Sequence, residues 1–391
     1  MVALVALLLL AGGAISLWWG YNEAQRSALA GHQQQAEALA GRIAGVHAQV
    51  MSSAELSLWA RVEELAPDAV RRALWSDRSL VKTWAMRGTL HLLPAAEFPL
   101  WQAALSTRRP WEAGAWQRGF GVTLAELERV NDAVGEALDG RLLTREELAA
   151  AVAERTGSPK LGDKLRESWG ALLKPASALG RLCFAPSQGQ QVRFTRPDTW
   201  LGGWTDHDPD EAMAEVTHRF LAAPGPVTRE DFARWWGIPG PARGRWLLER
   251  LGDEVARVEV ECAPAYALAA DLLSLAKAGR GRSKAGGSAT VRLLPAFDQY
   301  VITATRQAED LMPGPFKARV YRPQGWLSPV LLVGGRMEGV WRQETRGRRM
   351  AVTVEPFAGP LPARARHAAE AEAERLAAWS GSQLELRWAD G

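Results

Sequence analysis

Recurrent helix-start signatures constrain the fold of this chain more than any other feature of its sequence. Thr123, Thr144 and Thr228 are each followed three residues later by Glu or Asp. This is the pattern of a capping box, in which a hydroxyl and a carboxylate bind backbone N–H groups of the first helical turn. Asp208 precedes a proline at the first helical position, where the missing N–H costs nothing. These signatures predict several short helices with defined starts.

The predicted helices fall into a repeated order. In the middle of the chain, helices predicted at 123–138, 144–157 and 164–173 precede two short strands at 181–184 and 191–195. A polar turn with a glycine separates the strands, which is typical of a β-hairpin. Three helices followed by a hairpin are the order of elements in a winged helix.

The same order recurs on both sides, with little residue identity between the copies. The downstream copy consists of helices at 208–221, 228–236 and 241–251 and a strand at 255–261. The upstream copy fits more loosely. A helix capped by Ser52 and Glu55 and a second helix over 68–75 precede a strand at 89–93.

The pattern changes near the C-terminus. Residues 277–288 (KAGRGRSKAGGS) are rich in Gly, Arg and Lys; composition favours a solvated linker, and the alternative is a flexible basic arm against phosphates. Short apolar runs then predict a small β-rich domain, at 290–294, 329–333, 338–341 and 350–355. A last helix over 363–379 and a strand-like tail end the chain.

Together these patterns predict an α+β fold of three tandem winged-helix units and a β-rich C-terminal domain. A chain of 391 residues exceeds one ordinary hydrophobic core. The predicted parts are an apolar segment at 1–21, winged-helix units at 22–118, 119–204 and 205–276, a basic linker at 277–288, and a β-rich domain with a terminal helix at 289–391.

The first 21 residues contain no charged side chain and are long enough to span a bilayer. They lack the basic start and the cleavage site of a secretory signal. A membrane anchor, a buried first helix and sequence translated from a misplaced start all stay open. Arg26 is the first basic residue, so the positive-inside rule would keep the remainder in the cytoplasm.

Composition and motifs exclude several classes of function. The net charge of +3 permits a nucleic-acid partner without demanding one. Cys183 and Cys262 share no short spacing, which excludes a disulfide framework and a cysteine-based zinc site. The six histidines are scattered, and there is no Walker loop, H-E-x-x-H motif or nucleophile elbow. Neither a metal nor a cofactor is therefore expected.

His47 and Gln49 are the pair with the clearest chemical potential. They follow Gly45, a plausible helix end. Residues two apart diverge on a helix but share one face of an extended segment. There the imidazole could take a proton from a water molecule that the amide orients. From the residues alone, an ordinary hydrogen-bonded pair at a helix end is the better-supported interpretation.

The segment 81–92 carries groups suited to DNA. Lys82 and Arg87 are candidate phosphate contacts, and Trp84 and His91 are candidate supports of a pocket, beside a predicted turn. The alternative is an amphipathic helix that runs into a strand, with His91 in or near the core.

Five further residues are candidates with simpler alternatives. Arg193 on the predicted hairpin, and Arg280, Arg282 and Lys284 in the basic linker, are candidate DNA contacts. Asp298 could stabilise a developing sugar cation, although capping a turn is its more ordinary role.

Four stretches carry a resemblance to a known family. They are VHAQVMSSAELSLWAR at 46–61, LVKTWAMRGTLHLLP at 80–94, LLPAFDQYVI at 293–302 and GRMEGVWR at 335–342. Together and in this order they resemble the AlkZ-like winged-helix DNA glycosylases, a bacterial family, over roughly residues 40–360.

The resemblance implies three winged helices and a β-rich region around a concave channel for double-stranded DNA. It implies excision of purines alkylated at N7, in some members from interstrand crosslinks, and in several members protection against self-made alkylating antibiotics. The family's Gln–apolar–Gln catalytic motif corresponds to His47 and Gln49. A His–apolar–Gln version occurs in the family with bulky guanine adducts, so this departure bears on the substrate more than on the reaction.

The leading hypothesis is a monofunctional DNA glycosylase with His47 as base and Gln49 as water-orienting partner. It is expected to be a cytoplasmic, nucleoid-associated monomer. No lysine at the motif suggests Schiff-base chemistry, and an N7-alkylated guanine is cationic and already a good leaving group. The rival is a non-enzymatic winged-helix DNA-binding protein or transcriptional regulator, and a third possibility is a degenerate membrane-tethered paralogue.

Overall fold

The computed structural model describes residues 8–9, 32–168, 170–260, 263–281, 290–304, 309 and 311–389. The chain is divided into two units. The larger contains the chain up to Val70 together with everything from His218 onwards, and the smaller contains Arg71–Thr217. Helices and strands are mixed in both units, so the predicted α+β class is confirmed.

The first strands of the smaller unit form a β-hairpin. Strands β3 (Leu80–Trp84) and β4 (Leu90–Pro94) pair antiparallel around the helical turn η1 (Met86–Gly88). The elements before and after the hairpin are α4 (Ala69–Trp75), η2 (Ala95–Glu97), α5 (Phe98–Ser106), η3 (Pro110–Glu112) and α6 (Gly114–Phe120). α4 spans the boundary between the two units.

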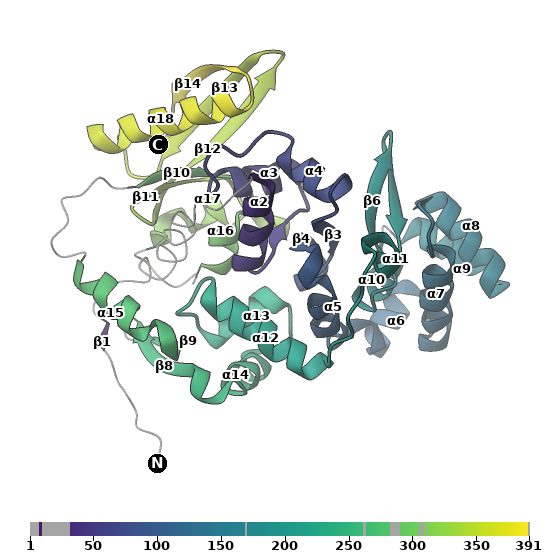
Figure 1. Cartoon of the computed structure of the whole chain (residues 1–391). Helices are drawn as coiled ribbons and strands as arrows, with labels where there is room; N and C mark the ends of the chain where they lie inside the picture. Colours follow the sequence, from purple (N-terminus) through teal and green to yellow (C-terminus); the bar gives the residue numbers. More distant parts are fainter. Residues whose placement is uncertain are drawn as a thin grey trace. The chain divides into compact units, whose positions relative to one another are not determined.

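The remainder of the smaller unit contains the predicted order of three helices and a hairpin, together with shorter helical elements and a short strand. Its helical elements are α7 (Leu124–Ala137), α8 (Arg145–Thr156), α9 (Pro159–Glu167), η4 (Ala171–Leu173), α10 (Lys174–Ala178) and α11 (Pro197–Leu201). Its strands are β5 (Leu143–Thr144), β6 (Cys183–Gln188) and β7 (Gln191–Thr195). The strands form a sheet in the order β5-β7-β6, and α7, α8 and α9 lie beside it (Figure 1).

The larger unit contains a second set of three helices and a hairpin. Its helices are α12 (Pro209–Ala222), which spans the unit boundary, α13 (Arg229–Trp236) and α14 (Pro241–Glu249). After η5 (Gly252–Glu254), the strands β8 (Val255–Val260) and β9 (Ala263–Leu268) pair antiparallel, and β1 (Leu8–Leu9) joins β8 in parallel. Stacked Phe220 and Trp235, with ring centroids 4.3 Å apart, fill the core between α12 and α13.

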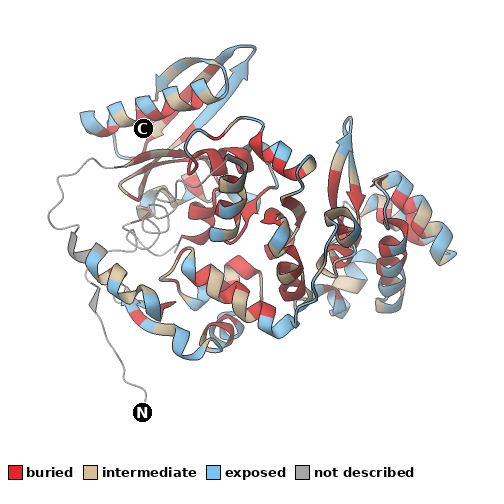
Figure 2. Cartoon of the chain, viewed as in Figure 1, coloured by how far each residue is buried: buried red, intermediate tan, exposed pale blue. Residues whose placement is uncertain are grey.

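A five-stranded sheet forms the C-terminal part of the larger unit. Its strands are β10 (Val291–Leu294), β11 (Val330–Val333), β12 (Arg336–Arg346), β13 (Arg349–Pro356) and β14 (Gln383–Trp388), paired in that order. Between β10 and β11 lie α16 (Gln299–Thr303), η8 (Gly314–Phe316), α17 (Lys317–Val320) and η9 (Pro323–Gly325). The helix α18 (Ala363–Trp379) packs its alanine and leucine face on the sheet (Figure 2).

The N-terminal part of the chain packs against this C-terminal helix. It comprises α2 (His32–Arg42), β2 (Val46–His47) and α3 (Met51–Trp59). The guanidinium of Arg375 lies 3.7 Å from the Trp59 ring centroid, and the Trp379 indole donates a 2.7 Å hydrogen bond to the Leu65 carbonyl. These contacts join segments more than 300 residues apart.

The predicted helix starts are confirmed. Thr123, Thr144 and Thr228 each form a reciprocal capping box, and the Asp208 carboxylate accepts N–H bonds at the start of α12. The predicted last helix at 363–379 coincides with α18.

Other predictions about local structure are wrong. Ser52 and Glu55 lie inside α3, whose N-cap is Val50 without a side-chain cap. The helix expected at 164–173 begins earlier, because Pro159 occupies its first turn, and it ends at Glu167. The hairpin strand β9 was not predicted.

The basic linker is partly helical. α15 (Leu272–Gly281) follows η6 (Ala269–Asp271) and continues through the first residues of the predicted linker. Leu275, which is 4% exposed, packs with the β8–β9 hairpin and supports this helix. Residues 282–289 lie outside the described part of the chain.

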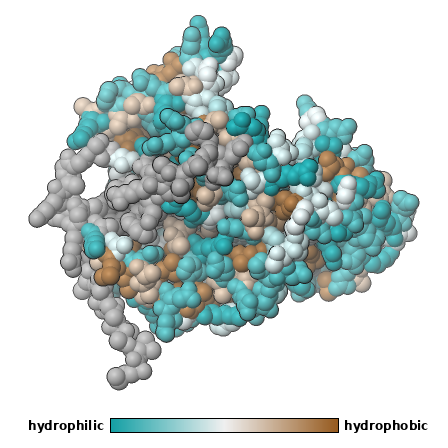
Figure 3. Space-filling view, in the orientation of Figure 1, coloured by the Kyte–Doolittle hydropathy of each residue, from teal (hydrophilic) through white to brown (hydrophobic). Residues whose placement is uncertain are grey.

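The surface on the face shown in Figure 3 is mostly hydrophilic over the described residues. The described helices include none that is both long and apolar enough to cross a membrane. The apolar segment 1–21 lies outside the described residues except for Leu8–Leu9.

Thr144→Ala is expected to lower the free energy of unfolding by about 1 kcal/mol, because the N-cap oxygen for Glu147 N–H is lost. In the same capping box, the N–H donated by Thr144 lowers the pKa of the Glu147 carboxyl. The contribution of this carboxylate to stability is therefore complete above the ordinary glutamate pKa and is lost as the pH falls through the lowered pKa of the folded state. Urea unfolding measures the change. Thr144→Ser, which also removes the methyl group, should stay near wild type; equal losses in both variants would contradict the cap.

Candidate active site

The chain leaves helix α2 immediately before His47. Ala44 and Gly45 have left-handed φ angles of 56° and 91°. The Gly45 N–H donates to the Ala40 carbonyl at 2.8 Å and the Ala44 N–H donates to the Gly41 carbonyl at 3.1 Å, the two hydrogen bonds of a Schellman C-cap. The predicted helix end is confirmed, with Ala44 at the C′ position and Gly45 one residue beyond it.

Strand β2 places His47 in a buried position. The His47 side chain is 5% exposed, between Val46 and Ala48, which are buried. Gln49 lies at a bend after the strand and is exposed. The two candidate catalytic residues thus lie in the non-helical segment between α2 and α3. Their joint action on one water molecule remains a prediction.

The Phe297 ring stacks on the His47 imidazole. Their centroids are 4.9 Å apart and their planes differ by 23°. Phe297 also contacts Trp326, with ring centroids 4.8 Å apart, and Trp326 is 52% exposed. Phe297 has a φ of 57°, a left-handed conformation that costs a bulky residue on the order of 1–3 kcal/mol. A strained loop therefore holds an aromatic face against the imidazole.

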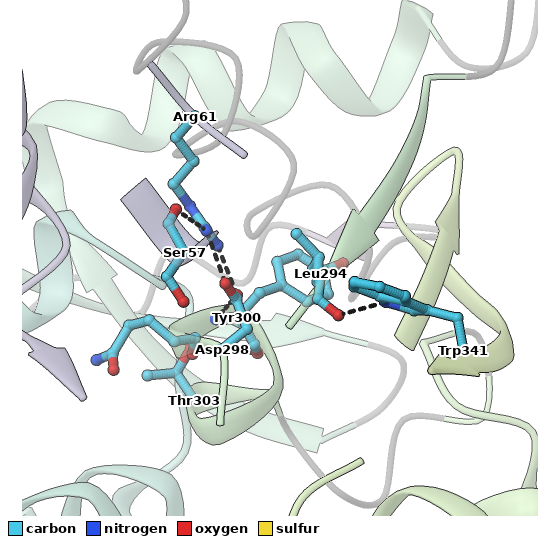
Figure 4. Close-up of polar contacts among 8 residues, drawn as sticks. Ser57, Arg61, Leu294, Asp298, Tyr300, Thr303 and Trp341 are labelled. Atoms are coloured by element: carbon cyan, nitrogen blue, oxygen red, sulfur yellow. Dashed lines mark hydrogen bonds and ion pairs between the residues drawn. The ribbon is translucent and has the colours of Figure 1, made fainter. Parts of the chain in front are cut away.

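A buried ion pair holds this loop (Figure 4). Two guanidinium nitrogens of Arg61 donate to the two carboxylate oxygens of Asp298 at 2.6 and 2.8 Å, and the side chains are 5% and 0% exposed. Arg61 also donates to the Ser57 carbonyl at 2.9 Å. The Asp298 carboxylate accepts the Tyr300 N–H at 2.9 Å and so caps α16. The capping role of Asp298 is confirmed, and Arg61 neutralises the charge that was a candidate for the sugar cation.

The C-terminal sheet anchors the other side of the loop. The Trp341 indole on β12 donates a 2.8 Å hydrogen bond to the Leu294 carbonyl at the end of β10 (Figure 4). The Tyr300 hydroxyl donates to the Gly335 carbonyl at 2.5 Å. Two of the stretches that carried the resemblance, 293–302 and 335–342, are therefore in direct contact.

The segment 81–92 forms the β3–β4 hairpin, so the helix of the alternative interpretation is wrong, whereas its strand and its buried His91 are confirmed. Lys82 and Trp84 lie on β3 in the smaller unit; the Lys82 ammonium is 5.4 Å from the Phe184 ring centroid, and burial lowers the pKa of Lys82. His91 on β4 is fully buried and contacts the Thr89 carbonyl through Nδ1 at 3.0 Å.

The remaining candidate DNA contacts are dispersed. Arg193 lies on β7, and its Nε donates to the Pro186 carbonyl within the hairpin at 2.7 Å. Arg280 lies near the end of α15. Arg282 and Lys284 lie outside the described residues.

Sequence reasoning missed Arg61 and Phe297 as members of the site. Arg61 pairs with a residue 237 positions away, so no local pattern reveals the contact. Both residues nevertheless lie within the stretches that carry the resemblance. Across the described chain, no group of three His, Cys, Asp or Glu side chains could hold a metal ion.

Comparisons with known proteins agree with one another. Residues 40–379 match a family model described as DNA glycosylase AlkZ-like. A curated protein of Streptomyces sahachiroi, the Interstrand DNA cross-link repair glycosylase, is 36% identical over 363 residues, which are 91% of this chain and 94% of that protein. The solved structure of Streptomyces sahachiroi DNA glycosylase AlkZ matches with a TM-score of 0.83 and 32% identity, over 96% of this chain and 99% of that one.

Proposed function

The chain belongs to the AlkZ-like DNA glycosylase family, and from this premise we propose that it hydrolyses the N-glycosidic bond of N7-alkylated purines in DNA. The family makes the protein a DNA glycosylase with DNA as its substrate, which favours the enzyme over the rival regulator. The N7-alkylated purine, and the roles of His47 and Gln49, are the proposal.

The proposed reaction needs little chemistry from the protein. His47 takes a proton from a water molecule, the water oxygen bonds to C1′ of the sugar, and the C1′–N9 bond breaks. The bonding electrons neutralise the cationic purine, which leaves as a neutral base, and the product is an abasic sugar. General-base assistance of this kind contributes typically about 10²–10⁴-fold, and correct placement of the water adds to it.

The stacking of His47 on Phe297 is the observation that carries the proposal. The imidazole centroid lies 4.9 Å from that of the Phe297 ring. Phe297 lies on the loop that the buried Arg61–Asp298 pair fixes. A base held in one orientation needs little reorganisation when the water is deprotonated. Gln49, which is exposed, is proposed to orient this water through its amide.

Bulky and crosslinked adducts are included in the proposed substrate class. The curated relative is named as an interstrand cross-link repair glycosylase. A bulky adduct is too large to be flipped into a tight pocket, so excision on an open surface suits it better. Resistance of a producing host to its own alkylating antibiotic would be one use of such an activity.

The test is base release from defined DNA. Duplexes that carry N7-methylguanine, a bulky N7 adduct or an N7-linked interstrand crosslink are incubated with the full chain. Free modified base and alkali-labile abasic sites are expected from at least one of them. Tight binding to all three duplexes without any release would contradict the proposed function.

A further inference from the structure

A cavity of about 270 Å³ lies within the smaller unit; the candidates Trp84 and Arg87 line it, and it shares no lining residue with the buried loop that contacts His47. It is formed around the turn η1, helices α5 and α6, and helix α10. Three of its lining residues are cationic, namely Arg87, Arg108 and Lys174. Four are aromatic, namely Trp84, Trp111, Trp116 and Phe120.

The charges of Arg108 and Lys174 favour an anion in this cavity. The residues described as its lining include no acidic side chain. Burial lowers the pKa of Arg108, and burial together with the charge of Arg108 lowers the pKa of Lys174. Two partly desolvated like charges repel each other, and a bound anion would stabilise both. A phosphate offers several oxygens to such a set of donors.

The third cation is presented by a strained turn. Arg87 and Gly88 have left-handed φ angles of 59° and 68° between β3 and β4. A guanidinium nitrogen of Arg87 lies 3.5 Å from Nε2 of the buried His91. A Cβ on Gly88 would meet the Lys174 ammonium at 3.6 Å. Strain in a non-glycine residue persists where the surroundings fix it, and it is typical of ligand-binding loops.

The aromatic wall is suited to a planar ring. Trp116 and Phe120 on α6 lie 4.5 Å apart between centroids, and Phe120 is 38% exposed. The Trp84 ring packs edge-to-face against Phe184, with centroids 4.8 Å apart. Bases stack on such side chains without regard to sequence, while cations beside them hold the backbone phosphate.

We propose that this cavity binds one nucleotide unit of a DNA strand, with its phosphate on Arg87, Arg108 and Lys174 and its base or sugar against Trp116 and Phe120. The site deepens the proposed function, because it adds a grip on the substrate that is separate from base removal. Its volume lies just below the range of about 300–1,000 Å³ that is usual for ligand pockets, so it has room for no more than one nucleotide unit.

The affinity of the full chain for a fluorescein-labelled DNA duplex and single strand, measured by anisotropy over a range of salt concentrations, tests the proposal. Arg108→Gln and Lys174→Gln should each weaken binding about tenfold and reduce the slope of log K against log salt by about one. The matched control is Arg109→Gln: Arg109 pairs with Glu112 at 3.2 Å, is half exposed and does not line the cavity. It should leave both quantities near wild type. Equal effects of all three variants, or none, would overturn the proposal.

Two further arms identify the occupant and separate this proposal from the proposed function. Phe120→Leu should weaken single-strand binding without changing the salt slope, and an unchanged affinity would remove the base from the proposal. If free deoxynucleoside monophosphate binds wild type but not Arg108→Gln, while DNA affinity is the same for both, the occupant is a free nucleotide and the DNA assignment is overturned. If the chain releases no modified base but shows the expected affinity pattern, the proposed function is contradicted and the nucleotide site in the cavity is supported.

Discussion

His47→Ala is expected to lower the rate of N7-methylguanine release by about 10²–10⁴-fold, the usual contribution of a positioned general base, while the affinity for duplex DNA stays near wild type. The imidazole is 5% exposed and stacked on Phe297, so it offers little surface to bind the DNA backbone. Single-turnover kinetics with saturating protein measure the chemical step without a contribution from binding.

The matched variants separate proton transfer from water placement. His47→Gln restores the first position of the Gln–apolar–Gln motif that the resemblance implies, and its amide can orient water but cannot accept a proton. It should therefore keep more activity than His47→Ala on N7-methylguanine. Gln49→Ala should lower release while leaving the stacked imidazole in place. If His47→Ala releases base as fast as wild type, the base must be sought elsewhere.

The helices of this chain were the most predictable part of its fold. Capping boxes such as that at Thr144 are local, so their spacing alone identifies where a helix begins. The hairpin at 181–195 was predictable for the same reason, because alternation and a glycine turn lie within a few residues. The predicted start of helix α9, at residue 164, was wrong because the helix begins at Pro159, before the apolar residues that indicated it.

The candidate site was predictable only as a list of residues. His47 and Asp298 were singled out from chemistry and from the resemblance, but nothing near either residue reveals that Phe297 covers the imidazole. The same holds for Arg61, whose guanidinium meets Asp298 across 237 positions. Arg87 and Trp84, which line the cationic cavity, were among the sequence candidates, but Arg108 and Lys174 were missed, because one follows α5 and the other begins α10, far apart in the sequence.

Asp298→Asn is expected to lower the free energy of unfolding by about 3–5 kcal/mol, the usual effect of leaving one partner of a buried ion pair without its counter-charge. Both side chains are almost fully buried, so water cannot replace the lost carboxylate around Arg61. The amide oxygen of asparagine can still accept the Tyr300 N–H that caps α16, so the loss reports the charge rather than the cap. Urea unfolding of the full chain, followed by tryptophan fluorescence, measures it.

Two controls make this result specific to the buried pair. Glu385→Gln removes the carboxylate of an exposed pair with Arg387, in the same unit, and should cost far less stability than Asp298→Asn, because solvent screens exposed pairs. The double variant Arg61→Met with Asp298→Leu removes both charges and should recover much of the loss, since an apolar replacement of a buried pair is often close to neutral. If Asp298→Asn unfolds no more easily than Glu385→Gln, the ion pair does not hold the Phe297 loop, and the orientation of His47 must be fixed by stacking alone.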